Sequence, residues 1–570
     1  MKFKFPNPNF TCLADRRAFY FLLFTLVIGA FFRFYNLNWD QGYFFNPDET
    51  NNISLPASHL SPPFKPEEFT YGSLTIYLYR ALGELVVFIT NNSAWIDAGH
   101  LNLLGRFVSA TLSTLMIFVV YLLGKKIADA KTGLLAAFLT SVNVGLIQAA
   151  HFGTTETILT LGGILLIFPL LTIMKKEGYS QGYWLWGLTL GIVASAKISA
   201  LVFTPIFLLA HLISLSKKEF VKRKLLFLSS GLLLVSTFFL ISPYTFIAFP
   251  DFFESFKFES GVASGKIPIF YTAQFLDTTT YFFQIKHIFP WIAGWPVMVF
   301  SFFGLLLTLF LGFKTFDKVK IFLVLLPLLY FLYTGSLFVK WTRYMVPLMP
   351  FLSLFASVSL VYLFQIFKKP IFKSVATVLI CVICVLQALW AIAFFNIYQQ
   401  PDTRIMASKW IYQNIPNNSK ILLEPLDVVS LPLSLKNYQS KDYQQIWFDF
   451  YGLDDYTAWE KKEELVQELS KNLETADFII IGSRRLWANR IRLDDKFPLG
   501  SRYYKSLFAG NLGYEKIKEV VSTPKIGDLI INDNPAEETF QVFDHPTVII
   551  FKNTKRFSQT TLAKRILYDE

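Results

Sequence analysis

Two acidic motifs in the sequence could do chemistry. The run Asn-Pro-Asp-Glu at positions 46–49 places Asp48 beside Glu49, and a second segment, 151–156, ends in Glu156. A carboxylate in such a place could deprotonate a hydroxyl group or bind a cation. The first run is also an ordinary helix start, because Asn caps helices, Pro favours the first helical position and acids stabilise the first turn. The two interpretations are compatible, since a helix start can also present a catalytic acid.

A smaller set of side chains could bind substrate. His151 lies in the second acidic segment, but a lone His is more often a hydrogen-bonded structural residue than a metal ligand. Three basic residues, Arg33, Arg106 and Lys197, lie at or near the ends of apolar runs, where snorkelling of the charged group is the simple explanation.

Arg343 precedes Tyr344 at another such boundary. A phosphate at the lipid headgroup level would suit the planar guanidinium, and the tyrosine hydroxyl could add a hydrogen bond. Arg343 and Tyr344 are therefore a candidate phosphate site.

The elements that must position these residues are membrane helices. Of the 570 residues, 53% are hydrophobic and 16% are charged, whereas a soluble domain carries about 25% charged residues. This composition excludes a soluble multi-domain enzyme and a disordered chain. About eleven runs are long and apolar enough to be spans: 19–34, 103–123, 132–149, 157–174, 183–194, 198–215, 225–241, 291–313, 321–338, 344–367 and 375–395.

The net charge of +12 reports orientation rather than nucleic-acid binding, because the basic residues cluster in alternate connections. By the positive-inside rule these clusters are cytoplasmic, as is the N-terminus. The clusters are Lys2, Lys4, Arg16 and Arg17; Lys125, Lys126 and Lys131; Lys175 and Lys176; Lys217, Lys218, Lys222, Arg223 and Lys224; Lys314, Lys318 and Lys320; and Lys368, Lys369 and Lys373. No nucleic-acid partner is expected.

The other connections should then be exoplasmic. They are the long loops 36–102 and 243–290 and a C-terminal domain, 398–570, whose composition turns polar. That domain alternates helix-like runs at 402–414 and 459–472 with strand-like runs at 420–424, 477–482 and 547–551. The predicted fold is therefore an α-helical polytopic membrane domain, 1–397, followed by a small α/β soluble domain.

Several other signals carry little weight. Cys381 and Cys384 have zinc-like spacing but lie in the middle of an apolar run. The sequence has no nucleotide-binding glycine motif and no nucleophile elbow. An exoplasmic site has no ready supply of nucleotide-activated donors, so a lipid-linked donor fits better.

The order of these motifs resembles that of the GT-C superfamily of polytopic glycosyltransferases, in particular family 39, which includes protein O-mannosyltransferases and the transferase that adds aminoarabinose to lipid A. Asn46 stands where that family commonly has His, which weakens any role for this position. The matching segments are Arg33-Phe34-Tyr35-Asn36-Leu37 with 46–49, Gly105-Arg106-Phe107-Val108-Ser109, the segment 151–156, Ala196-Lys197, and Arg343-Tyr344-x-x-Pro347-x-x-Pro350.

The resemblance implies inverting transfer of a sugar from a polyprenyl-phosphate donor to a hydroxyl acceptor on a protein, lipid or glycan, at the exoplasmic face of the cell membrane. Asp48 would be the base, Glu49 would orient it or the acceptor, and Glu156 would line the same cavity. Arg343, Tyr344, Lys197 and Arg106 would stabilise the lipid phosphate, and Arg33 and His151 are further candidates for substrate binding. No cofactor is obligatory, although oligosaccharyl relatives of the superfamily use a divalent cation.

Two other functions compete with this one. A transporter or lipid flippase would use intramembrane charges along a pathway, but the sequence shows no pair of related halves. A polymerase or ligase of surface glycans would keep the scaffold and use diphosphate-linked donors. The long loops and the soluble tail favour the transferase over the transporter.

Overall fold

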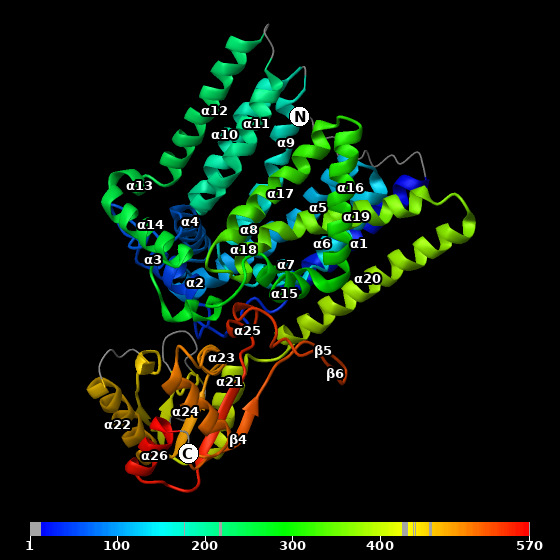
Figure 1. The fold of residues 1–570 in the computed structure, drawn as a ribbon. Coiled ribbons are helices and arrows are strands. Elements are labelled where there is room, and N and C mark those ends of the chain that lie inside the picture. Colours follow the sequence, from blue (N-terminus) through cyan, green and yellow to red (C-terminus); the bar gives the residue numbers. More distant parts are fainter. Residues whose placement is uncertain are drawn as a thin grey trace. The chain divides into compact units, whose positions relative to one another are not determined.

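The computed structural model describes residues 13–175, 177–215, 219–424, 431–436, 438, 441–454 and 459–568. Of the basic clusters, Lys2, Lys4, Lys176, Lys217 and Lys218 lie outside these residues. The chain forms two compact units (Figure 1). The helical unit comprises the chain up to Leu37, Asp48–Ile267 and Thr279–Ile392. The second unit comprises Asn38–Pro47, Pro268–Thr278 and the chain from Ala393.

The described residues confirm a polytopic membrane protein, with nine helical segments long and apolar enough to cross a bilayer, or ten if one bent pair is counted as a span. These segments are Arg16–Phe34 in α1 (Leu13–Phe34), α4 (Ser73–Thr90), α5 (Ala98–Ile127), Glu156–Ile173 in α8 (Glu156–Leu165) and α9 (Ile167–Ile173), α12 (Phe220–Ile241), Pro290–Lys314 with α16 (Trp295–Lys314), α17 (Lys318–Ser336), Thr342–Ile366 with α18 (Thr342–Met345) and α19 (Met349–Ile366), and Pro370–Asn414 with α20 (Pro370–Gln399).

The segments differ from the predicted spans in four places. The run 132–149 is the bent pair, in which α6 (Ala130–Ser141) and α7 (Val144–Ala150) meet at 55°, and the Asn143 side chain caps α7 by accepting from the Leu146 N–H. The run 183–194 lies in α10 (Tyr179–Ala196), which begins with polar and aromatic residues, and 198–215 is a shorter apolar segment. Conversely, α4 lies inside the predicted loop 36–102.

Small residues bring pairs of these helices into backbone contact. A Cβ on Gly304 of α16 would lie 1.8 Å from the Phe355 carbonyl oxygen of α19, and one on Gly187 of α10 would lie 2.3 Å from the Ser230 carbonyl oxygen of α12. Close approach at small residues is the usual basis of helix association in membranes, where burial of apolar surface gives little driving force.

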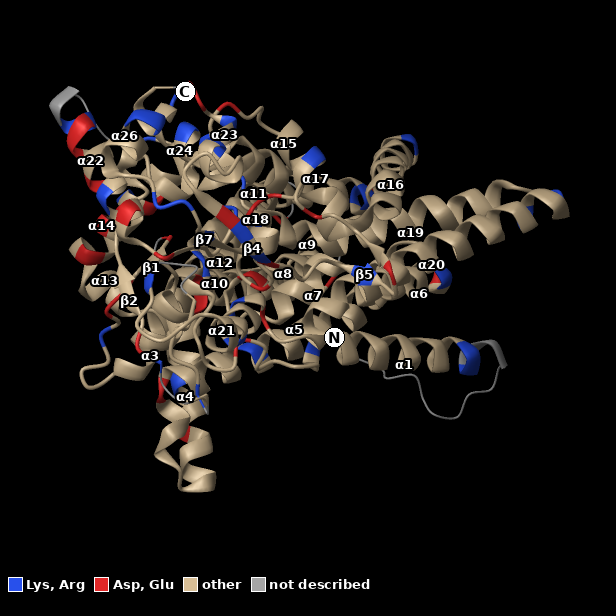
Figure 2. Cartoon of the chain, turned by 90° about the horizontal axis from the view of Figure 1, so that it is seen from below, with Lys and Arg blue, Asp and Glu red and all other residues tan. Residues whose placement is uncertain are grey.

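Charged residues are sparse along the long apolar helices (Figure 2). In this view α1, α16 and α20 are tan along most of their length, and blue residues mark their ends. This distribution is what a bilayer requires, because a charge at the centre of the hydrocarbon is costly.

The second unit holds a five-stranded sheet with the order β2-β1-β3-β7-β4. Its first three strands are parallel, and β7 runs antiparallel to β3 and β4. The strands are β1 (Lys420–Leu423), β2 (Gln444–Ile446), β3 (Phe478–Ile481), β4 (Tyr514–Val520) and β7 (Val548–Asn553), with a separate hairpin of β5 (Lys525–Ile526) and β6 (Leu529–Ile530). The small α/β domain is thus confirmed, and the predicted strands at 420–424, 477–482 and 547–551 are its three central ones.

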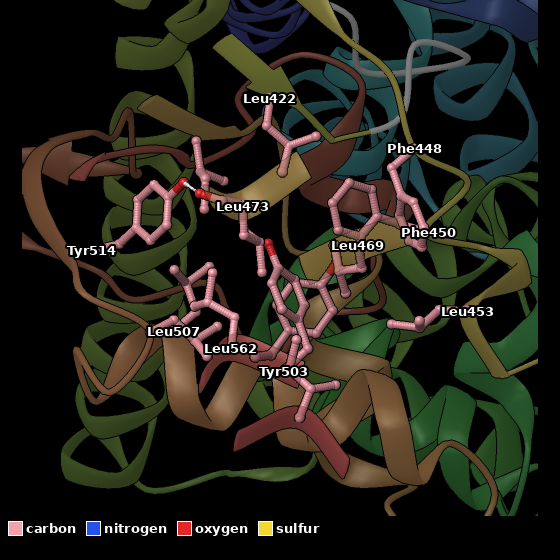
Figure 3. Packing of buried hydrophobic residues seen from close by; sticks show 14 of the residues in the cluster. Leu422, Phe448, Phe450, Leu453, Leu469, Leu473, Tyr503, Leu507, Tyr514 and Leu562 are labelled. Carbon is pink, nitrogen blue, oxygen red and sulfur yellow. Dashed lines mark hydrogen bonds between the residues drawn. The ribbon is translucent and has the colours of Figure 1, made fainter. Parts of the chain in front are cut away.

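Helices pack on both faces of this sheet. On one face α22 (Trp459–Thr475), α24 (Pro498–Phe508) and α26 (Gln559–Leu567) cover β3 and β7 with a core that includes Leu469, Tyr503 and Leu562 (Figure 3). The Tyr514 hydroxyl reaches across to donate to the Leu473 carbonyl at 2.6 Å. On the other face lies α21 (Thr403–Asn414), the helix predicted at 402–414.

Candidate active site

Asp48 and Arg343 meet although 295 residues separate them. Asp48 belongs to α2 (Pro47–Glu49), a single turn after the first span, and Arg343 belongs to the short helix α18. Arg343 Nη1 donates to Asp48 Oδ2, and the two side chains are 22% and 18% exposed. The guanidinium lies 4.4 Å above the Trp341 ring, and its Nε has no hydrogen-bond partner among the described residues. The pair is therefore partly exposed to solvent, while the Nε donor itself is buried.

A second ion pair joins Lys197 to Glu156, with Nζ 2.6 Å from Oε1. Glu156 begins α8, and Lys197 lies at the break between α10 and the next helical turn. The Lys197 ammonium is 5.3 Å from the centroids of both the Tyr71 and Tyr344 rings. Because Tyr344 follows Arg343, its ring links the two ion pairs into one cluster of charged and aromatic groups.

A third ion pair is buried. Arg106 donates from Nε and Nη2 to the two oxygens of Glu49 at 2.7 and 2.8 Å, and both side chains are 1% exposed. The Gly153 N–H also donates to Glu49 at 2.9 Å, and Arg106 Nη1 donates to the Leu37 carbonyl at 2.9 Å. The structure thus places Glu49 in a bidentate pair that ties α2 to α5, and it places Arg106 there too rather than beside Arg343.

Two further candidates contact backbone carbonyls. Arg33 is fully buried and donates to the Ser113 hydroxyl and to the carbonyls of Gly29, Thr140 and Ser141. The His151 ring nitrogens lie 2.8 and 2.9 Å from the carbonyls of Ile147 and Tyr35. The structure does not bring either residue into the cluster around Asp48, and both side chains join helix ends to neighbouring segments.

Tyr71 is a site residue that no sequence pattern pointed to. Its ring packs beside Lys197, and its phenol interacts electrostatically with Arg343, Asp48 and Glu156. Burial raises the pKa of this phenol well above its usual value. The position is fixed by Gly72, whose N–H donates to the Ala196 carbonyl at 3.0 Å and where a Cβ would meet the Ser195 carbonyl oxygen at 2.0 Å.

Glu259 is a second residue that the sequence analysis missed. It lies on α14 (Phe249–Ser264), within the predicted loop 243–290, and interacts electrostatically with Arg343, Asp48 and Lys197. Burial raises the pKa of its carboxyl group. Among the described residues no three His, Cys, Asp or Glu side chains are grouped closely enough to hold a metal ion.

Comparisons with known proteins address the fold. Residues 93–244 match the family model described as dolichyl-phosphate-mannose-protein mannosyltransferase. No curated protein matches the chain in sequence. The oligosaccharyltransferase of Archaeoglobus fulgidus in the apo form superposes with a TM-score of 0.53 at 11% identity, over 94% of this chain and 88% of that chain.

Two further solved structures are similar. The same A. fulgidus enzyme tethered to an acceptor peptide with the NVT sequon gives a TM-score of 0.52 at 12% identity, over 95% of this chain and 89% of that chain. The apo structure of ArnT from Cupriavidus metallidurans gives 0.46 at 12% identity, over 85% of this chain and 95% of that chain. The superposition on the A. fulgidus enzyme and the family-model match confirm the fold expected from the motifs, which is the polytopic fold of the GT-C glycosyltransferases.

Proposed function

We propose that the protein is an integral-membrane glycosyltransferase that moves a sugar from a polyprenyl-phosphate donor to a hydroxyl acceptor. The observation that carries the proposal is the convergence of Asp48 with Arg343, beside the Lys197–Glu156 pair, from four segments far apart in sequence. The description of the matching family, with its dolichyl-phosphate donor, supports the lipid-phosphate class.

The reaction needs a cationic site for the leaving phosphate. Transfer forms a bond between the acceptor oxygen and the anomeric carbon, while the bond from that carbon to the phosphate oxygen breaks and polyprenyl phosphate leaves. Negative charge grows on the phosphate as the bond breaks, so fixed positive groups stabilise the transition state more than the ground state. Arg343 supplies a partly exposed guanidinium, and Lys197 supplies an ammonium held by Glu156 and two aromatic rings.

The reaction also needs a base for the acceptor proton. Asp48 suits this role because its carboxylate is partly exposed and lies against Arg343. A donor phosphate that binds Arg343 competes with Asp48 for the guanidinium and frees the carboxylate to accept the hydroxyl proton. Donor binding would then prepare the base, which ties proton removal to the presence of the leaving group.

Glu49 and Arg106 have a different role in this proposal. Their bidentate pair fixes α2 against α5, and because Glu49 follows Asp48 directly, the pair also fixes the backbone that carries the base. Glu49 is thus a positioning residue for Asp48. We also place the site on the exoplasmic side, from the distribution of the basic clusters along the sequence.

The proposal is tested by reconstituting the full chain into proteoliposomes and supplying synthetic polyprenyl-phosphate sugars with mixed peptide, lipid and glycan acceptors. Mass spectrometry should find an acceptor heavier by one sugar residue, with release of polyprenyl phosphate. Product only from diphosphate-linked donors would instead indicate a glycan polymerase or ligase. If no donor yields product while the labelled lipid crosses the bilayer, the protein is a flippase and the transferase proposal fails.

A further inference from the structure

A pocket of about 620 Å³ opens in the helical unit between an extended segment and α14. Residues 65–70 line one side, and Asp251, Glu254, Ser255, Phe258 and Glu259 of α14 line the other. Both segments belong to the loops that the sequence places on the exoplasmic side. The volume is that of a site for a small molecule or for one or two residues of a polymer.

The lining of this pocket is strongly acidic. Five carboxylates face one ammonium there, from Glu67, Glu68, Asp251, Glu254 and Glu259 against Lys65. Lys65 pairs with Asp251 at 2.6 Å, and His59 pairs with Glu67 at 3.1 Å. Among the described residues, Glu68, Glu254 and Glu259 form no ion pair, so the pocket keeps an excess of negative charge that an anionic ligand would have to overcome.

This pocket lies near the proposed reaction site, because Thr70 lines the pocket and precedes Tyr71, whose ring centroid is 5.3 Å from the Lys197 ammonium. Glu259, which also lines the pocket, interacts electrostatically with Arg343, Asp48 and Lys197. The charged groups therefore divide into a basic set, where Arg343 and Lys197 suit the donor phosphate, and an acidic set that lines the neighbouring pocket. Opposite charges of the two sets would keep two substrates of different charge in separate places.

The distribution of carboxylates argues against a metal ion as the occupant. Among the described residues, no three acidic or histidine side chains come close enough together to coordinate one cation, and hard cations need several oxygen ligands at once. Charges spread along a pocket suit an extended organic cation, whose ammonium groups accept several hydrogen-bonding partners over a longer distance.

We propose that this pocket is the acceptor site and that it selects an acceptor bearing ammonium groups. The inference rests on the proposed transferase function. Glu68 and Glu254 attract the cationic group, while Thr70, which precedes Tyr71, and Glu259, which interacts electrostatically with Asp48 and Arg343, lie on the side where the acceptor hydroxyl would meet the base. Lysine side chains of a peptide and the free amine of an amino sugar share this chemistry.

Binding to the full chain in nanodiscs tests the proposal with two pairs of fluorescent probes. One pair is a serine-rich decapeptide with two lysines and its analogue with two glutamines. The other is deacetylated chitotetraose and its N-acetylated form. The cationic member of at least one pair should bind at least fivefold more tightly, and raising the salt concentration should weaken that binding. The pair that discriminates identifies the source of the ammonium group.

The double variant Glu68→Gln/Glu254→Gln should lose this preference, with binding of the cationic probe reduced roughly fivefold. Glu515→Gln, a matched change at an exposed residue of β4, should not alter it. Equal binding of cationic and neutral probes, or an unchanged preference in the double variant, would overturn the proposal. Competition by micromolar Mn²⁺ alone would also overturn it, because the pocket would then be a metal site.

Transfer assays separate this inference from the proposed function. Sugar transfer that is indifferent to acceptor charge would refute the acceptor preference and leave the transferase intact. Absence of transfer with every donor and acceptor would refute the transferase and the acceptor role with it. Transfer that is faster to the lysine peptide than to its glutamine analogue, and that loses this difference in the double variant, would support both.

Discussion

Substitution of the two neighbouring carboxylates, Asp48→Asn and Glu49→Gln, should separate chemistry from stability. Each change removes one charge and keeps the shape of the side chain. Asp48 is 18% exposed and paired with an Arg343 that is 22% exposed, whereas Glu49 and Arg106 are each 1% exposed. The difference in side-chain exposure therefore predicts a loss of activity for Asp48→Asn and a loss of stability for Glu49→Gln.

Glu49→Gln should mainly lower the stability of the folded protein. Glu49→Gln leaves the Arg106 guanidinium buried without a counter-charge and weakens the hydrogen bond from the Gly153 N–H. Removing one partner of a buried ion pair destabilises a protein by about 3–5 kcal/mol. Gln keeps one oxygen that can accept a hydrogen bond and so retains part of the interaction. We therefore expect a loss of stability near the lower end of that range.

Asp48→Asn should mainly lower the rate of sugar transfer. A partly exposed ion pair contributes about 0–1 kcal/mol to stability, so Asp48→Asn should unfold close to the temperature of the unsubstituted protein. A general base contributes about 10²–10⁴ in rate, which corresponds to about 3–5 kcal/mol of transition-state stabilisation. Transfer by Asp48→Asn should fall by that factor.

Both quantities can be measured on the same reconstituted samples. Thermal unfolding is followed by tryptophan fluorescence, since the chain has 12 Trp, and initial rates are measured with a synthetic polyprenyl-phosphate sugar. Transfer by Asp48→Asn at more than a third of the unsubstituted rate would refute its role as base. Equal thermal shifts for the two variants would refute the inference from exposure.

Three further perturbations have defined outcomes. Lys197→Met should reduce donor-lipid binding by about tenfold and Glu156→Gln by less, because the Lys197 ammonium would face the phosphate and Glu156 only holds the ammonium in place. Equal effects of the two variants in a titration with polyprenyl phosphate would contradict these separate roles. Burial alone would lower the pKa of His545, but Asp544 and Asp533 flank the ring and raise this pKa to about 10 from 6.5. The stability that comes from the raised pKa is full below about pH 6.5 and is lost as the pH rises through 10, so the unfolding temperature of the full chain should fall over that window. If a His545→Asn variant shows the same fall, His545 is not its origin. Arg33→Lys should lower thermal stability, because Lys cannot make the four hydrogen bonds of the buried guanidinium, and any loss of transfer should be no greater than the loss of folded protein measured by size-exclusion chromatography.

The fold was largely predictable because the bilayer requires long apolar segments, which composition and hydropathy reveal directly. The spans at 103–123 and 225–241 are continuous apolar helices in the structure, as the sequence predicts. Helix breaks were harder to predict, because hydropathy averages over about 19 residues and hides a bend such as that between Ser141 and Val144. Amphipathic α4, with Arg80 and Glu84 in one ion pair, lies near the limit of the hydropathy criterion.

The site was predictable only in part, because the motifs identify charged residues without their partners. Nothing in the sequence pairs Asp48 with Arg343, or distinguishes that pair from Glu49 and Arg106. Tyr71 and Glu259 lie outside the recognised motifs, and their places depend on tertiary contacts such as that of Gly72 with the backbone at Ser195.

The residues of the proposed site share one structural property, which is that each lies where a helix begins or breaks. Asp48 is in the single turn α2, Glu156 begins α8, Lys197 separates α10 from the next turn, and Arg343 is in the four-residue helix α18. Irregular backbone at membrane depth is tolerated where it is buried in protein or lines a cavity, and charges there mark function more often than structure. Arg33 in the last turn of α1 and Glu49 in α2 also lie at helix ends, but both are buried and paired inside the protein. Arg106 lies within the continuous helix α5 and is buried too. A helix break that also leaves the charged group partly exposed, as at Asp48, Lys197 and Arg343, therefore distinguishes the groups that can meet a substrate from those that hold the helices together.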